Sequence, residues 1–350
     1  MLLAPFDSNR DRKPRNIGAR MRRYFCLALL STSYCLAAYT AAATALLAPI
    51  PTINRHPLVD VFGLPPAPQA LDKPGYSIAI GSERSNISNG GRSGRESLLL
   101  DGESRRDEMR LRWQMNETAQ LSLGLHYQSH SGGKLDNLIE AFHDLGFPNG
   151  IRDARPKDSI LFYYTVDGIT QLEYRGDAGL GDTQLSYQQA LYKRDDEQLS
   201  WRIAIELPTG SARRLTGSNT VDMAFDLSHH QHHIVANTNV STFLRGGALL
   251  IAGDGLLQAQ RKDWVLFGSA GFQWRPSARW QAKLQLEMHT ALYHSQLKEM
   301  GHLAVQSALG LAYDASQRVN LEVFFSEDLI VDTAPDIVFG LRLHWRDRAL

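Results

Sequence analysis

The chain contains 350 residues, and its 37 lysines and arginines balance its 37 aspartates and glutamates. A neutral total argues against nucleic acid as a partner, because nucleic-acid binding usually shows as an excess of basic residues. Hydrophobic residues make up 43% of the chain, an ordinary value. It does not exclude a membrane barrel, since half of each barrel strand is polar.

The one long apolar run lies near the N-terminus and holds both cysteines, Cys26 and Cys35. Two arginines after Met21 precede its apolar core at 24–39, and small residues follow at 41–45. A basic start, an apolar core and a small-residue cleavage motif predict a cleaved secretory signal peptide. An uncleaved membrane anchor is the alternative.

Five regions of the chain follow from this reading. We place the signal peptide at 21–45 and interpret residues 1–20 as a non-native extension ahead of the true translation start. Residues 46–74 are rich in proline and lack periodicity, which predicts a lead-in segment in the periplasm. The barrel is expected at 75–346, followed by a tail at 347–350. Cleavage would remove both cysteines, so no disulfide is expected in the mature chain.

Large apolar residues recur at every second position from Tyr76 onward. One clear case is the run IVFGLRLHW at 337–345, in which large apolar residues alternate with small or polar ones. The runs at 109–115, 121–128 and 280–288 show the same pattern. A period of two is that of a β-strand, so the chain is predicted to be all-β.

Short and long connections alternate between these runs. The short ones are expected at 116–118, 167–168, 193–198, 229–233, 275–279 and 314–318. The long ones are expected near 83–95, 129–158, 176–181, 208–219, 245–262, 292–302 and 326–336. Such a rhythm is typical of bacterial outer-membrane barrels and predicts about fourteen strands, with both termini on the short-turn side. If the Asp167-Gly168 hairpin protrudes, the expected count falls to about twelve.

The predicted fold class is an antiparallel transmembrane β-barrel with a short helix in one long extracellular loop. A closed sheet satisfies its backbone hydrogen bonds within lipid, while its outer face is apolar and its inner face is charged. Aromatic residues are expected near strand ends at the membrane interface. They are Trp113, Tyr127, Trp201, Trp264, Trp274, Trp280 and Trp345. A soluble antiparallel sandwich also alternates and is the competing fold.

Five stretches carry motifs beyond simple alternation. They are NRHPLVDVFGLP (54–65), HSGGKLDNLIEAFHDLGFPNGIRDARP (130–156), GLGDTQLSYQQALY (179–192), IELPTGS (205–211) and SEDLIVDTAPDIVFGLRLHW (326–345). Together they resemble an uncharacterised proteobacterial family, known only as a domain of unknown function and assigned to the cell envelope. The GLGD and LPTG motifs are also similar to outer-membrane barrels of the phenol-degradation (MetA-pathway) type. The resemblance implies a barrel and supplies no catalytic residue.

The polar positions of the strands are expected to face the lumen. The lumen-lining candidates are Arg110, Arg112, His126, Arg202, Glu206, Lys283, Glu287, His289, Arg342 and His344. Two interpretations stay open on sequence alone. The set forms a polar conduit or binding surface for a charged solute, or its opposite charges compensate one another and fill a narrow barrel.

The connection at 129–158 is too long for a plain hairpin loop, so it is expected to be functional or structured. Apolar residues at helical spacing predict a short amphipathic helix there, acting as a lid or plug. The lid candidates are Leu135, Leu138, Ile139, Phe142, His143, Asp144, Phe147, Pro148, Arg152 and Arg155, with Asp332 and Asp336 as ion-pair partners. A helix packed on the rim for stability is the alternative.

Metal and catalytic motifs are weak in this sequence. The run HHQHH falls in a predicted turn without a carboxylate partner, so neither a metal nor another cofactor is expected. The chain contains no GxSxG and no HExxH motif. A lipid-active enzyme is therefore the least favoured class, and no catalytic residue is assigned.

The sequence thus predicts an exported outer-membrane barrel of a Gram-negative bacterium that passes or binds a small solute, with apolar or aromatic solutes included. A structural or adhesion-type envelope barrel with a filled lumen is the alternative. The expected partners are outer-membrane lipid and, through the C-terminal aromatic strand, the barrel-assembly machinery.

Overall fold

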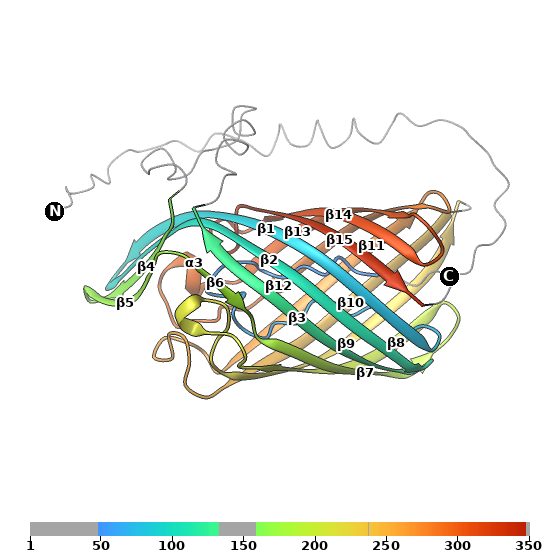
Figure 1. Ribbon diagram of the computed structural model, residues 1–350, viewed down its shortest axis with the longest axis horizontal. Coiled ribbons are helices and arrows are strands. Elements are labelled where there is room, and N and C mark those ends of the chain that lie inside the picture. The colour runs from blue at the N-terminus through green and yellow to red at the C-terminus, as the bar shows by residue number, and fades with distance from the viewer. Residues whose placement is uncertain (1–47, 133–158, 237, 348–350) are drawn as a thin grey trace, which may run out of the picture. The chain divides into compact units, whose positions relative to one another are not determined.

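The computed structural model describes residues 48–132, 159–236 and 238–347. Fifteen strands form one antiparallel sheet in these residues, and twelve of them close into a barrel (Figure 1). The ring closes because β1 pairs with β15 on one side and with β2 on the other. The barrel strands are β1 (Gly75–Ser93), β2 (Glu96–Asn116), β3 (Ala119–Ser131), β7 (Thr183–Lys193), β8 (Glu197–Leu207), β9 (Val221–Val235), β10 (Thr238–Ala252), β11 (Trp264–Arg275), β12 (Trp280–His289), β13 (Ala304–Asp314), β14 (Val319–Asp328) and β15 (Ile337–Arg346).

Three further strands extend the sheet beyond the ring. β4 (Leu161–Val166) pairs with the first residues of β2, and β5 (Ile169–Tyr174) pairs with β4. β6 (Asp177–Leu180) pairs with the end of β3. The Asp167-Gly168 turn therefore closes a hairpin outside the ring. The expectation of about fourteen barrel strands was wrong, and its alternative of twelve is confirmed.

Short and long connections lie at opposite ends of the barrel, as predicted, except for the short turn at 94–95, which lies at the long-loop end. The short ones are at 117–118, 194–196, 276–279 and 315–318 and after Val235, at the end where β1 begins and β15 ends. The long ones are at 132–182, 208–220, 253–263, 290–303 and 329–336. They include a 3-10 helix, η2 (Ala212–Arg214), and a short helix, α3 (Lys298–Gly301). Among the described residues, no helix is long and apolar enough to cross a membrane.

Two predicted connections are strands in the structure. The segment at 83–95 is mostly the continuation of β1, which pairs with β2 as far as Ser93 and turns only at 94–95. The HHQHH run lies inside β9 and pairs with β8 and β10. Backbone partners on both sides, and no glycine or proline within the run, keep this part of β9 extended.

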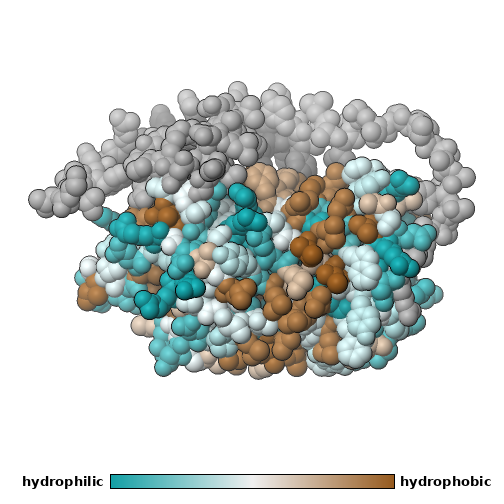
Figure 2. Space-filling model, viewed as in Figure 1, coloured by the Kyte–Doolittle hydropathy of each residue, from teal (hydrophilic) through white to brown (hydrophobic). Residues whose placement is uncertain are grey.

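The outer face of the barrel is apolar and the inner face is polar, because side chains alternate along each strand. In β12, Leu284 and Leu286 are exposed, whereas Gln285 and Glu287 are buried. Figure 2 shows apolar side chains gathered over the strands, with polar ones predominating at the end that carries β4 and β5. Many large apolar side chains exposed over the strands suit contact with hydrocarbon rather than with water.

The inside of the barrel is filled by residues 48–72, which we call the lumen segment (Figure 1, blue). Every residue from Pro49 to Leu71 is buried, except for the half-buried Gln69. The sequence had suggested a periplasmic lead-in here and did not indicate this position. Proline has no backbone N–H, so a proline-rich chain leaves few donors unsatisfied when it is buried without a strand partner.

Candidate functional site in the barrel lumen

The lumen segment enters at the short-turn end, reaches the long-loop end and returns. The backbone N–H of Ile50 donates to a glutamine in the middle of β12 (2.9 Å). At the apex, the carbonyl of Leu58 accepts a hydrogen bond from Tyr293, beyond the end of β12 (2.6 Å). On the way back, the N–H of Leu71 donates to Gln198, near the short-turn end of β8 (3.1 Å). The segment therefore occupies the lumen with two limbs.

A hydrophobic cluster, here called the mouth cluster, closes the long-loop end around the apex. Its members include Leu58, Val59 and Phe62 of the lumen segment, Leu98, Leu100, Phe162 and Tyr164 of the β2–β4 extension, and Leu292, Tyr293, Leu297 and Met300 of the connection before β13. The rings of Phe62 and Tyr293 meet edge to face at 6.3 Å. Each large apolar side chain buried there stabilises by roughly 1.5–3 kcal/mol, so the mouth cluster anchors the apex.

A buried charge network ties the ascending limb to the wall. The guanidinium of Arg55 donates to both carboxylate oxygens of Glu83 in β1 (2.7 and 2.8 Å) and to Asp60 (2.7 Å). Asp60 also accepts from the side-chain amide of Gln128 in β3 (3.1 Å). Bidentate guanidinium–carboxylate pairs are among the stronger hydrogen-bonded contacts in proteins. Arg55 is thus the principal polar latch of the lumen segment.

The descending limb is held by single polar contacts. The N–H of Gly63 donates to Asp222 in β9 (2.9 Å), and the carbonyl of Pro66 accepts from Arg202 in β8 (2.9 Å). Only glycine fits at position 63, because a Cβ there would lie 2.8 Å from the Cβ of Asp222 and 3.0 Å from that of Glu206. Contacts of this kind can be exchanged for water at little net cost.

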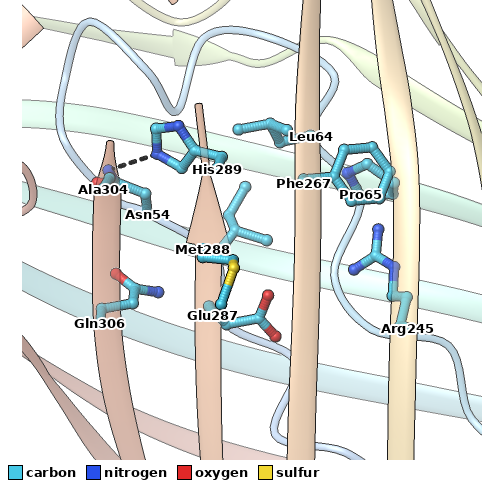
Figure 3. A pocket seen from close by; sticks show the side chains of 11 residues that line it. Asn54, Leu64, Pro65, Arg245, Phe267, Glu287, Met288, His289, Ala304 and Gln306 are labelled. Carbon is cyan, nitrogen blue, oxygen red and sulfur yellow. Dashed lines mark hydrogen bonds between the residues drawn. The ribbon is translucent and has the colours of Figure 1, made fainter. Parts of the chain in front are cut away.

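A small cavity adjoins the ascending limb near β11 and β12 (Figure 3). The side-chain amide of Asn54 bonds the ring of His289 (2.9 Å) and donates to the carbonyl of Thr333 (2.9 Å). On the other side, the guanidinium of Arg245 lies 4.3 Å from the ring centre of Phe267. The cavity has a volume of about 20 Å³, which is room for about one water molecule.

The ten predicted lumen residues all have buried side chains in the structure. Three of them form ion pairs with other residues of the barrel wall: Lys283 with Glu322 (2.5 Å), Arg202 with Asp226 (2.8 Å) and Arg110 with Glu108 (2.9 Å). Sequence reasoning identified these strand residues but missed Asn54, Arg55 and Asp60, which lie against them. The signal that could have found these three is the NRHPLVDVFGLP motif, where charged and large apolar residues interrupt a proline-rich stretch.

The predicted lid residues from Leu135 to Arg155 lie outside the described residues, as does the helix expected there. Asp332 and Asp336 lie half-buried in the connection before β15, at the long-loop end. Their ion pairs with Arg152 and Arg155 stay a prediction.

Two histidines of the HHQHH run in β9 contact neighbouring side chains of β10. His230 stacks on Phe243 with ring centres 5.9 Å apart, and His232 bonds the hydroxyl of Ser241 (3.1 Å). Within the described ranges, no group of three or more His, Cys, Asp or Glu side chains is arranged to hold a metal ion.

Comparison with known proteins supports the fold. No curated protein matches the chain. Among solved structures, the COG4313 outer membrane channel from Pseudomonas putida F1 is similar, with a TM-score of 0.50 and 11% identity, covering 82% of this chain and 98% of that one. The KdgM porin (TM-score 0.42, 7% identity, 77% and 98% covered) and the CymD monoaromatic hydrocarbon channel (0.33, 11%, 80% and 89%) are more distant. At these identities the likeness concerns the fold alone.

The predicted membership of an uncharacterised family is confirmed by the sequence itself. The model of one family, described as a protein of unknown function (DUF3187), matches residues 26–346, which include every strand of the barrel. The chain therefore belongs to the DUF3187 family.

Proposed function

We propose that this protein is an outer-membrane channel of a Gram-negative bacterium for a small solute, and that the lumen segment is its plug. In the conformation described here the channel is closed. A solute passes when the two limbs of the lumen segment shift away from the wall. Apolar or aromatic solutes, suggested by the sequence motifs, belong to the range to be tested.

The observation that carries this proposal is the content of the lumen. In a barrel of about eight strands, side chains alone fill the interior. Here twelve strands enclose a further stretch of chain, from Pro49 to Leu71, in two limbs. Removal of that stretch would leave a wide polar passage, because the wall around it carries charged and amide side chains.

The apolar outer face and the alternation of short and long connections support a location in the outer membrane. Export by a cleaved signal peptide and insertion through the C-terminal strand are parts of the same proposal. Recovery of the mature protein in the soluble periplasmic fraction, without detergent, would contradict this location.

A second candidate is a structural envelope barrel whose lumen stays filled. The mouth cluster favours it, since the apex of the lumen segment is anchored by apolar burial as well as by exchangeable polar contacts. The two candidates differ in one quantity, the free energy needed to move the lumen segment.

Planar-bilayer conductance of refolded protein separates the candidates. We expect rare openings for the intact chain and sustained conductance for a variant that lacks residues 48–72. Circular dichroism and heat-modified gel migration would verify that the shortened variant is a folded barrel. A folded variant without conductance would refute the channel proposal and leave the structural barrel.

A further inference from the structure

A second cavity, between the two limbs of the lumen segment and the wall, is surrounded by positive charge. Four arginines line it, from strands β2, β8 and β15: Arg110, Arg112, Arg202 and Arg342. All four side chains are buried. On the opposite side the cavity is bounded by prolines of the lumen segment.

Two of these arginines have no polar partner among the described residues. Arg110 pairs with Glu108 and Arg202 with Asp226. Arg112 and Arg342 form neither a salt bridge nor a hydrogen bond with any residue that the structure describes, and Nη1 of Arg112 is fully buried. A buried, unpaired cation is costly, so this arrangement calls for an anion or for ordered water.

The nearby carboxylates are Glu108, Glu83 and Glu322, and each of them is hydrogen-bonded to another cation. Glu108 accepts from Arg110 at 2.9 Å. Glu83 is bound by Arg55 through two hydrogen bonds. Glu322 accepts from Lys283 at 2.5 Å. The positive charge of the cavity is therefore in excess of its own counter-charges.

Small residues flank Arg112 on both sides and Arg342 on one side. Ser77 in β1 and Ser122 in β3 are the direct neighbours of Arg112 across the sheet. Arg342 lies between Gly81 in β1 and Glu322 in β14, and Glu322 accepts a hydrogen bond from Lys283. The wall thus combines these two guanidinium groups with hydroxyl and glycine positions that do not cover them.

We propose that Arg112 and Arg342 form a binding site for the oxyanion of a small solute, a carboxylate or a phosphate group. The planar fork of a guanidinium group matches two oxygens of either anion. The inference rests on the proposed function, because it names the class of solute that this lumen accepts.

Binding is coupled to the lumen segment. The cavity has a volume of about 20 Å³ in the closed conformation, which is room for about one water molecule. An organic anion fits only when the parts of the lumen segment that bound the cavity, Pro49, Pro51 and residues 66–69, move away from the wall. The carbonyl of Pro66, which accepts from Arg202 at 2.9 Å, is the oxygen that a bound anion would replace.

Isothermal titration calorimetry on the detergent-solubilised full-length mature barrel tests this site. Benzoate is the first probe, benzamide its neutral counterpart of matching shape, and inorganic phosphate the second oxyanion. We expect binding of benzoate or phosphate and no binding of benzamide. The variants Arg112→Met and Arg342→Met should each weaken oxyanion binding by about ten- to a hundredfold, as expected for the loss of hydrogen bonds to a charged group.

Arg275→Met is the matched control, since Arg275 is also buried in the lumen but is paired with Asp314 (3.1 Å). Its affinity for benzoate should equal that of the intact protein. Arg112→Lys and Arg342→Lys replace the methionine variants if one of those fails to fold. They should weaken oxyanion binding, because lysine lacks the planar guanidinium group. Benzamide binding as tight as that of benzoate, or unchanged affinity in both methionine variants, would overturn the site.

The outcomes also separate this site from the channel proposal. Anion binding in detergent together with a shortened, folded barrel that does not conduct would keep the site and refute the channel. Conductance of the shortened barrel together with no oxyanion binding by the intact protein would refute the site alone.

Discussion

Removal of the Arg55 guanidinium is expected to release the lumen segment. In Arg55→Met a side chain of similar length loses three buried hydrogen bonds, two to Glu83 and one to Asp60. Breaking a buried ion pair by removing one partner costs about 3–5 kcal/mol, because the remaining charge stays buried and unpaired. Asp60 keeps its amide donor Gln128 (3.1 Å) and the guanidinium of Arg106 (3.4 Å). Glu83 keeps only the hydroxyl of Thr52 (3.3 Å) among the described residues.

The lower value of about 3 kcal/mol is therefore the conservative choice, and it corresponds to a rise of roughly 150-fold in the ratio of open to closed barrels. Open probability in planar bilayers measures this ratio directly. Arg105→Met is the control, since it removes an arginine from a more exposed pair with Asp107 (2.9 Å). Adding Glu83→Gln to Arg55→Met should restore part of the closure, because the unpaired charge is removed. A folded Arg55→Met barrel with unchanged open probability would refute the latch.

Two further outcomes are expected. Leu284→Arg on the outer face should lower the free energy of unfolding from lipid bilayers by about 2–4 kcal/mol, measured by urea titration. Ser277→Arg, in a short turn, is the control. A similar loss of stability in the control would argue against a lipid-facing surface at Leu284. Gly340→Ala should destabilise the barrel by about 1–3 kcal/mol, because the new Cβ would lie 2.1 Å from the ring of Phe324. Gly246→Ala is the control, since no atom lies within 4 Å of a Cβ at that position. Equal thermal stability of the two variants would contradict the expected clash with Phe324.

The alternation of residues along the chain determined the strands and the sorting of their two faces. Leu284 and Gln285 lie on opposite faces because successive side chains of an extended chain point to opposite sides. This rule is local and does not depend on which strands are the neighbours in the sheet. For the same reason the buried polar residues of the wall, such as Arg202 and Lys283, could be identified without a structure. The grouping of the short turns at one end of the barrel could be predicted from the lengths of the connections, which are read directly from the sequence.

The tertiary structure alone decided features that depend on partners distant in the chain. The Asp167-Gly168 turn is visible in the sequence, but only the pairing of β4 with β2 places its hairpin outside the ring. The position of the lumen segment depends on contacts such as Arg55 with Glu83 and Gly63 with Asp222, which are 28 and 159 residues apart. A segment without periodicity gives no sequence pattern from which such distant contacts could be predicted. Its place inside the barrel follows from the enclosed space of the ring and from the polar groups that line it.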